Sequence, residues 1–136
     1  MRVLIDSNVL FSAVFRSGST PHQAYIKAVN PPYHCLVCDQ SIDELNESFI
    51  EKFPHRSDDL KMFLYDALAV IDVIPIPDAE HPNEIMLRDP DDALILRAAI
   101  AANADIIISG DLDFLESDIT HPEIISAAQF LKLPYP

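Results

Sequence analysis

Short apolar segments alternate with helical patterns along almost the whole of this 136-residue sequence. The apolar segments have the length of strands and lie at residues 2–5, 34–38, 70–76, 106–109 and 123–126. Because strands that are separated by helices usually lie parallel to one another, this alternation predicts an α/β fold, with a parallel sheet covered by helices on both faces. The length, at roughly 100–200 residues per domain, predicts one domain over residues 1–136.

Local signals predict where several helices begin and end. Thr20 opens a capping-box pattern that closes at Gln23, and Asp39 is expected to cap the next helix. Residues 89–92 (DPDD) place carboxylates in a first helical turn, where the helix dipole stabilises negative charge. Asn103 is expected to stop that helix, because asparagine tolerates the left-handed conformation found at helix C-termini.

The balance of charge limits the classes of partner. The chain has 9 Lys and Arg residues against 22 Asp and Glu residues, which gives a formal net charge of -13. Proteins that hold nucleic acid by bulk attraction usually carry a basic patch, and an anionic membrane surface would repel this chain. No apolar run approaches the roughly 18 residues that a membrane span needs. We therefore expect a cytoplasmic protein with no membrane partner.

Cys35 and Cys38 form a C-x-x-C pattern, which is typical of redox pairs and of half zinc sites. A four-thiolate zinc site needs a second pair, which this sequence lacks. A redox pair normally lies at a helix N-terminus, whereas these two residues fall in an expected buried strand. Since residues three apart on a strand point to opposite faces, we expect two buried, reduced thiols.

Acidic residues follow two of the expected strands and begin one expected helix. Asp6 follows residues 2–5, Asp111 follows residues 106–109, and Asp92 lies in the first turn of its helix. In a parallel α/β sheet these positions share the edge at which the strands end, which is the edge that binds ligands. Carboxylates this close must be protonated, paired or bound to metal, and their hard oxygens suit Mg²⁺ or Mn²⁺.

Each acid also has a purely local explanation. Asp6 can cap the helix that follows it, and Asp92 can serve only to stabilise a helix dipole. Asp111 and Asp113 lie in a turn, where aspartate is common for local reasons. Glu44 lies on the polar side of its helix, where a solvated side chain is the simpler interpretation.

Several segments resemble motifs of the PIN-domain family, in particular its VapC-like ribonuclease toxins from toxin–antitoxin systems. Residues 3–10 (VLIDSNVL) resemble the first acidic motif of that family. Residues 88–96 (RDPDDALIL) and 104–114 (ADIIISGDLDF) resemble its C-terminal pair, and residues 124–131 (IISAAQFL) resemble its closing strand and helix. The resemblance covers nearly the whole chain and implies a five-stranded parallel sheet sandwiched by helices.

The resemblance implies a metal-dependent endoribonuclease that hydrolyses phosphodiester bonds of RNA with one or two Mg²⁺ or Mn²⁺ ions. The implied catalytic acids are Asp6, Glu44, Asp92 and Asp111, and the implied metal ligands are Asp6, Asp92, Asp111 and Asp113. Asn8 and Ser109 resemble the small polar residues that orient the carboxylates. Glu47, one turn after Glu44, remains an alternative for the fourth acid.

Two other functions fit parts of the sequence. The fold can persist in a binding protein without catalysis, because acids can be present while the substrate path is blocked. A receiver-like phosphoacceptor domain also clusters acids around Mg²⁺. It needs an aspartate at the end of the third strand and a lysine at the end of the fifth, but Asp72 lies inside its expected strand and Lys132 lies in the C-terminal tail.

The resemblance also implies partners. These are an RNA substrate, a small cognate antitoxin that inserts a basic side chain into the acidic cleft, and a second copy in a homodimer. Four basic residues are the first candidates for phosphate contacts, namely Arg16, Lys27, Arg88 and Arg97.

Overall fold

Five parallel strands form one sheet in the computed structural model, which describes residues 1–135. The strands are β1 (Arg2–Ile5), β2 (His34–Cys38), β3 (Asp72–Ile74), β4 (Ile106–Ile108) and β5 (Glu123–Ile125). Their order in space is β3-β2-β1-β4-β5, and every neighbouring pair is parallel. The predicted α/β fold with a five-stranded parallel sheet is therefore confirmed.

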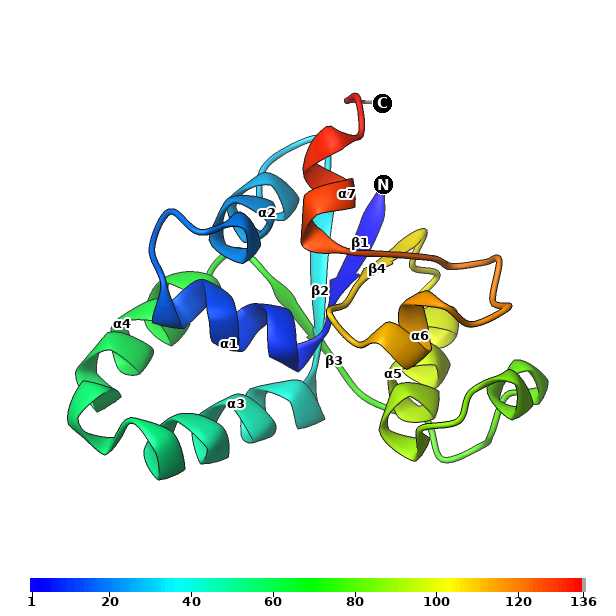
Figure 1. The fold of residues 1–136 in the computed structure, drawn as a ribbon, viewed down its shortest axis with the longest axis horizontal. Helices are drawn as coiled ribbons and strands as arrows, with labels where there is room; N and C mark the ends of the chain where they lie inside the picture. The colour runs from blue at the N-terminus through cyan, green and yellow to red at the C-terminus, as the bar shows by residue number, and fades with distance from the viewer. Residues whose placement is uncertain (136) are drawn as a thin grey trace.

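Helices cover both faces of this sheet, as expected (Figure 1). They are α1 (Ser7–Phe15), α2 (Thr20–Ala28), α3 (Asp39–Lys52), α4 (Ser57–Ala67), α5 (Pro90–Ala101), α6 (Leu112–Leu115) and α7 (Ala127–Lys132), with 3₁₀ turns η1 (Pro54–Arg56) and η2 (Pro82–Met86). Helices α1, α2, α3, α4 and α7 lie on one side of the strands, and α5 and α6 lie on the other (Figure 1).

The central strand β1 carries an uninterrupted apolar run because both of its faces are covered. Val3 and Ile5 belong to the core under α1 and α2, whereas Leu4 belongs to the core under α5, and all three side chains are fully buried. Successive residues of a strand point to opposite faces, so one strand supplies both cores.

The two cysteines follow the same alternation. Cys35 lies in the core under α1 and α2, and Cys38 lies in the core on the opposite face. Both thiols are free and buried, as predicted, and burial raises the pKa of each to about 12. Neither thiol is an activated nucleophile.

Some boundaries differ from those predicted. Ser19, not Thr20, caps α2, because the Ser19 hydroxyl accepts the His22 N–H. Helix α3 begins at Asp39 itself, so that residue does not act as the preceding cap. Strand β3 is shorter than residues 70–76, because the chain is still turning at Val70 after α4. Helix α6 and the turn η2 were not expected.

The stop predicted for α5 is confirmed, since Asn103 has a φ of 56° directly after the helix. Across residues 1–135 we find no helix that is both long enough and apolar enough to cross a bilayer.

Candidate active site

Asp6 lies where β1 passes into α1, at the carboxyl edge of the sheet. It is the N-cap of α1, and its Oδ1 accepts the Ser7 N–H at 2.7 Å. Its other oxygen, Oδ2, accepts the Ser109 hydroxyl at 2.9 Å. Its backbone N–H donates to the Ile108 carbonyl, which fixes Asp6 against the end of β4. The capping interpretation is therefore correct, and one oxygen remains directed to the neighbouring strand end.

Ser109 connects the acids that follow β1 and β4. Its fully buried hydroxyl donates to Asp6 and accepts the backbone N–H of Asp111 at 3.1 Å. Asn8 holds the same loop from the other side, since its Oδ1 accepts the Gly110 N–H at 3.1 Å. Ser109 thus contacts one carboxylate directly, whereas Asn8 contacts only the backbone of the loop that leads to Asp111.

Asp89, Asp92 and Asp111 form the tightest group of acids. One oxygen from each lies within 4.8 Å of the others, although Asp111 follows β4 and the other two begin α5. Asp89 caps α5 by accepting the Asp91 N–H at 2.9 Å. Asp92 is only 4% exposed, and its Oδ2 has no hydrogen-bond partner among residues 1–135.

This arrangement raises the pKa of two of the acids, Asp92 and Asp6. Burial raises the pKa of Asp92 to about 7, and the negative charges of Asp111, Asp89 and Asp6 act in the same direction. Burial also raises the pKa of Asp6, although the hydrogen bonds from Ser109 and Ser7 oppose that shift. A buried carboxyl group with an elevated pKa and an unpartnered oxygen is typical of a functional site.

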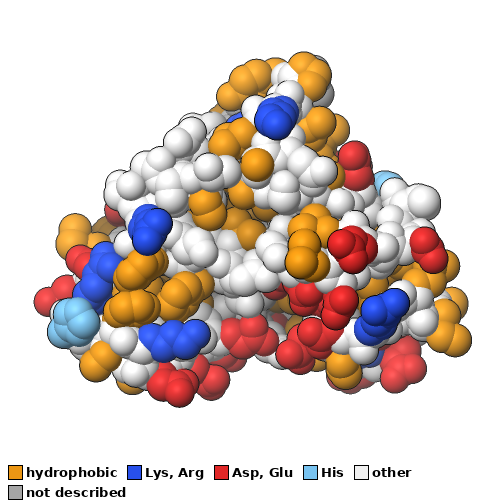
Figure 2. Space-filling view, in the orientation of Figure 1, with side chains coloured by type: hydrophobic (Ala, Val, Ile, Leu, Met, Phe, Trp, Pro, Cys, Tyr) orange, Lys and Arg blue, Asp and Glu red, His pale blue; other side chains and the backbone are white. Residues whose placement is uncertain are grey.

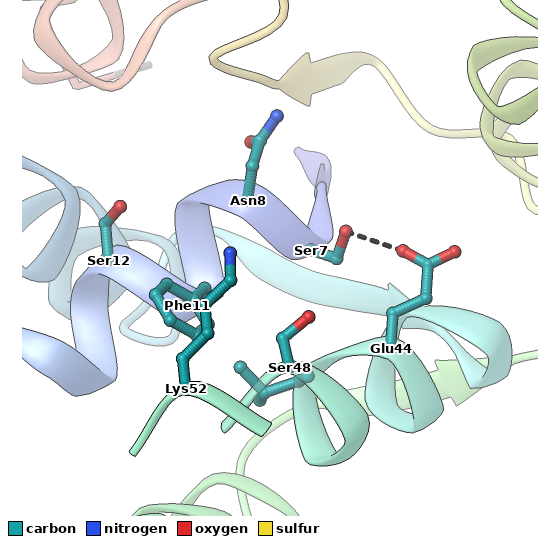
Figure 3. Close-up of a pocket in the computed structure, with 8 residues that line it drawn as sticks. Ser7, Asn8, Phe11, Ser12, Glu44, Ser48 and Lys52 are labelled. Atoms are coloured by element: carbon teal, nitrogen blue, oxygen red, sulfur yellow. Dashed lines mark hydrogen bonds between the residues drawn. The ribbon is translucent and has the colours of Figure 1, made fainter. Parts of the chain in front are cut away.

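Glu44 reaches the site from α3. Its Oε2 accepts the Ser7 hydroxyl at 2.8 Å (Figure 3), and its Oε1 accepts the Gln40 side-chain amide at 3.1 Å. Glu47, by contrast, is exposed and does not line the cleft. The geometry thus places Glu44 and not Glu47 beside the other acids.

The acids line a cleft of about 150 Å³ at this edge of the sheet. Its lining consists of Asp6, Ser7, Asn8, Glu44, Asp89, Asp91, Asp92, Ile95 and Asp111. Asp113, expected as a further metal ligand, is exposed on α6 and lies outside this lining, because that short helix turns its side chain outward. Asp89, which the sequence indicated only as a dipole-stabilising residue of a first helical turn, also belongs to the acidic cluster.

Two of the four expected phosphate-binding residues have structural roles instead. The Lys27 ammonium donates to the carbonyls of Phe130 and Leu133, which ties α2 to the end of α7. Arg97 forms an ion pair with Glu84 at 2.8 Å and holds the segment before α5. Both pairings join segments far apart in the sequence, so no local pattern indicated them. Two further candidates, Arg16 and Arg88, are exposed.

The donor set fits a hard divalent cation. Three carboxylates converge, one of them carries a buried oxygen without a partner, and like charges at this range repel unless a cation or a proton intervenes. Asp89, Asp92 and Asp111 are the residues closest to one another, and Asp6 and Glu44 line the same cleft.

Comparisons with known proteins identify the family of this chain. Residues 2–113 match the PIN domain family. The chain belongs to the PIN domain family. No curated protein matches this PIN domain in sequence.

Two solved structures share the fold of this PIN domain. One is VapBC2 from Rickettsia felis bound to a DNA fragment from their promoter, with a TM-score of 0.67 and 16% identity over 93% of this chain and 98% of that chain. The other is Mycobacterium tuberculosis VapC20, a sarcin-ricin loop cleaving toxin, with a TM-score of 0.55 and 14% identity over 82% of this chain and 92% of that chain. At these identities the likeness concerns the fold.

Proposed function

We propose that this PIN domain is a metal-dependent endoribonuclease that hydrolyses phosphodiester bonds of RNA. The observation that carries the proposal is the convergence of Asp89, Asp92 and Asp111, with the buried Asp92 oxygen that lacks a partner. A cluster built only to stabilise helix N-termini would leave its carboxylates solvated, whereas Asp92 is almost completely buried.

Asp92 and Asp111, with Asp6 and Asp89 beside them, would hold one or two Mg²⁺ or Mn²⁺ ions. When bound, such an ion lowers the pKa of a water molecule and neutralises charge that develops on the phosphate. Ser109 keeps the carboxylate of Asp6 and the backbone of Asp111 in register, which is the preorganisation that an electrostatic site requires. Glu44, fixed by the Ser7 hydroxyl, is placed to orient an attacking water or to accept its proton.

A role as the toxin of a toxin–antitoxin pair has support from the comparisons. One structural neighbour is a toxin that cleaves the sarcin-ricin loop. The other is a VapBC assembly bound to promoter DNA. We therefore propose RNA as the substrate and a small cognate antitoxin as a partner that covers the acidic cleft, with a homodimer as the assembly of the chain.

The test is cleavage of single-stranded RNA in Mg²⁺, in Mn²⁺ and in EDTA, with analysis of the product ends. We expect metal-dependent products that carry a 5′-phosphate and a 3′-hydroxyl. Asp111→Asn should abolish cleavage, whereas Asp118→Asn, the same change at an exposed aspartate outside the cleft, should retain it. Full activity of Asp111→Asn, or no cleavage by the wild type with either metal, would contradict the proposal and favour a non-catalytic binding protein.

A second pair of variants tests the fourth acid. Glu44→Gln should lower the turnover number, because it removes the carboxylate that Ser7 directs toward the cleft. Glu47→Gln should not, because Glu47 is exposed on the next turn of α3. The opposite result would exchange the two assignments.

A further inference from the structure

A groove continues from the acidic cleft along the surface between α1 and α3 (Figure 3). Its volume is about 320 Å³, and it shares Ser7, Asn8 and Glu44 with the cleft. Beyond these residues it is lined by Ser12, Ser48 and Lys52 and by the apolar side chains of Phe11 and Leu45. The groove therefore begins at the acids and ends at a cation.

The two walls of the groove have the same helical spacing. Glu44, Ser48 and Lys52 recur every four residues on α3, so they lie on one side of that helix. At a rise of 1.5 Å per residue, Lys52 lies about 12 Å along the helix from Glu44. Figure 3 shows the Lys52 amine and the Ser48 hydroxyl directed to the same space as the Ser7–Glu44 pair.

The opposite wall continues in the same direction along α1. Asn8 and Ser12 line the groove, and Ser12 also lines an adjoining hollow of about 350 Å³ that extends to Arg16. Arg16 follows Ser12 by four residues, as Lys52 follows Ser48. Both walls thus change from acidic or neutral to basic with distance from the cleft.

Aromatic rings position the cations at this end. The Lys52 ammonium lies 5.4 Å from the centre of the Phe11 ring. The guanidinium groups of Arg16 and Arg56 lie 6.0 Å and 5.0 Å from the centre of the Phe15 ring. Cation–π contacts of this kind hold a charge in place while its outer side stays in water.

Three of the nine Lys and Arg residues therefore lie around one aromatic patch, in a chain with a net charge of -13. Figure 2 shows basic side chains around a hydrophobic patch over α1 and α3, next to the acidic side chains at the middle of the same face. Arg56 is also paired with Asp59 at 2.8 Å, which leaves Lys52 and Arg16 as the cations of this surface without an ion pair among residues 1–135.

We infer that this groove, lined by Ser12, Ser48 and Lys52 and ending at Arg16, binds the backbone of a single RNA strand whose scissile phosphate lies in the acidic cleft. The inference rests on the proposed ribonuclease function. Hydroxyl, amide and ammonium donors match phosphate and ribose oxygens, and they form no pattern that reads bases. A groove of about 320 Å³ offers too little room for a duplex.

The length of the groove also fits a short stretch of a single RNA strand. Nucleotides stacked along one strand rise about 3.4 Å each, so the length of about 12 Å from Glu44 to Lys52 corresponds to about three to four nucleotides. An acidic protein segment would meet the same cations, but it would have to pass Glu44 and the acid cluster at the other end of the groove. The substrate phosphate is accepted there because the cleft is built for a divalent cation.

The experiment measures kcat and KM for a short fluorescein-labelled single-stranded RNA over a series of salt concentrations. It compares wild type with Lys52→Ala, Lys52→Arg and the matched control Lys132→Ala, whose lysine is exposed on α7 away from the groove. Binding of the same RNA in EDTA is followed by fluorescence anisotropy, with polyglutamate as the competitor. A thermal melt of each variant checks that it is folded.

We expect Lys52→Ala to raise KM several-fold at an unchanged kcat. The slope of log(kcat/KM) against log salt should become shallower by about 0.7, the value for one phosphate contact on a single strand. Lys52→Arg should restore the slope, and Lys132→Ala should leave it at the wild-type value. A folded Lys52→Ala protein with the KM and salt slope of Lys132→Ala would overturn the inference.

The two proposals fail in different ways. If wild type cleaves RNA and Lys52 has no effect on KM, the groove assignment is wrong and the ribonuclease stands. If wild type cleaves nothing but binds RNA in a manner that depends on Lys52 and salt, the ribonuclease is wrong and the groove stands. Polyglutamate and unlabelled RNA are compared as competitors at equal concentrations of negative charge. If polyglutamate displaces the labelled RNA more effectively, the groove binds an acidic protein segment and the inference is overturned.

Discussion

Replacement of Asp92 by asparagine should stabilise the metal-free protein above neutral pH. Asp92 has its pKa raised from 3.8 to about 7 in the folded protein, primarily by burial. The folded state therefore holds a proton that the unfolded chain has already lost at the same pH. Because the folded state binds more protons between these values, the free energy of unfolding falls as pH rises from about 4 to about 7.

The size of the effect follows from the shift. Each unit corresponds to about 1.36 kcal/mol, so ionisation of Asp92 lowers the stability of the metal-free wild type by up to about 4 kcal/mol at pH 8. An asparagine at this position does not ionise and avoids that loss. At about 2.1 cal/mol/K of unfolding entropy per residue, the difference corresponds to a gain in melting temperature of roughly 10–15 °C at high pH.

The assay is thermal unfolding in EDTA at several pH values between about 4 and 8, followed by circular dichroism. Wild type and Asp92→Asn should have similar melting temperatures at the acidic end and diverge as the pH rises. Asp58→Asn is the matched control, because Asp58 lies in the first turn of α4 but is exposed, and it should show a small loss without this divergence. A wild type whose stability is flat or rises with pH over this range would refute the reasoning.

Three further outcomes are expected. At pH 8, addition of Mg²⁺ or Mn²⁺ should raise the melting temperature of wild type but not of Asp92→Asn. The free energy of unfolding of wild type should rise by about 2.7 kcal/mol when the metal concentration is about 100 times its dissociation constant. Ser109→Ala should cost about 1–3 kcal/mol in urea unfolding, because it removes the donor to Asp6 and leaves buried polar groups unpaired, and it should also lower RNA cleavage. Cys35 and Cys38 should react with a thiol reagent only after unfolding and should form no intramolecular disulfide on oxidation, as thiol titration with and without urea would show.

The sequence was sufficient for the fold because the relevant signals are local. Strand β1 and strand β2 each carry an unbroken apolar run, which indicates burial on both faces, and a parallel sheet follows from the helices between them. The N-cap of α5 and its stop at Asn103 are likewise set by residues within one turn. Strand β3 was predicted too long, because its start depends on where the turn after α4 ends, and the hydrophobic pattern of the sequence does not indicate that point.

The site was predictable only in outline. The position of Asp6 and Asp111 after parallel strands was enough to bring them to one edge of the sheet. The resemblance to the PIN domain family supplied Glu44, which periodicity alone placed on a solvated face. Lys52 was missed, because its relation to the cleft depends on the way α3 packs against α1, and a single lysine at a helix end carries no such signal.

What the sequence alone determined is therefore the α/β architecture, the family and the edge at which the acids collect. Tertiary structure decided which acids meet, since Asp89 joined the cluster and Asp113 did not. It also decided which cations remain available near the site, because Lys27 and Arg97 bind carbonyl and carboxylate groups brought from distant segments. The physical reason is the range of the interactions: helix and strand patterns depend on neighbours a few residues apart, whereas the hydrogen bond between Ser109 and Asp6 joins residues 103 positions apart.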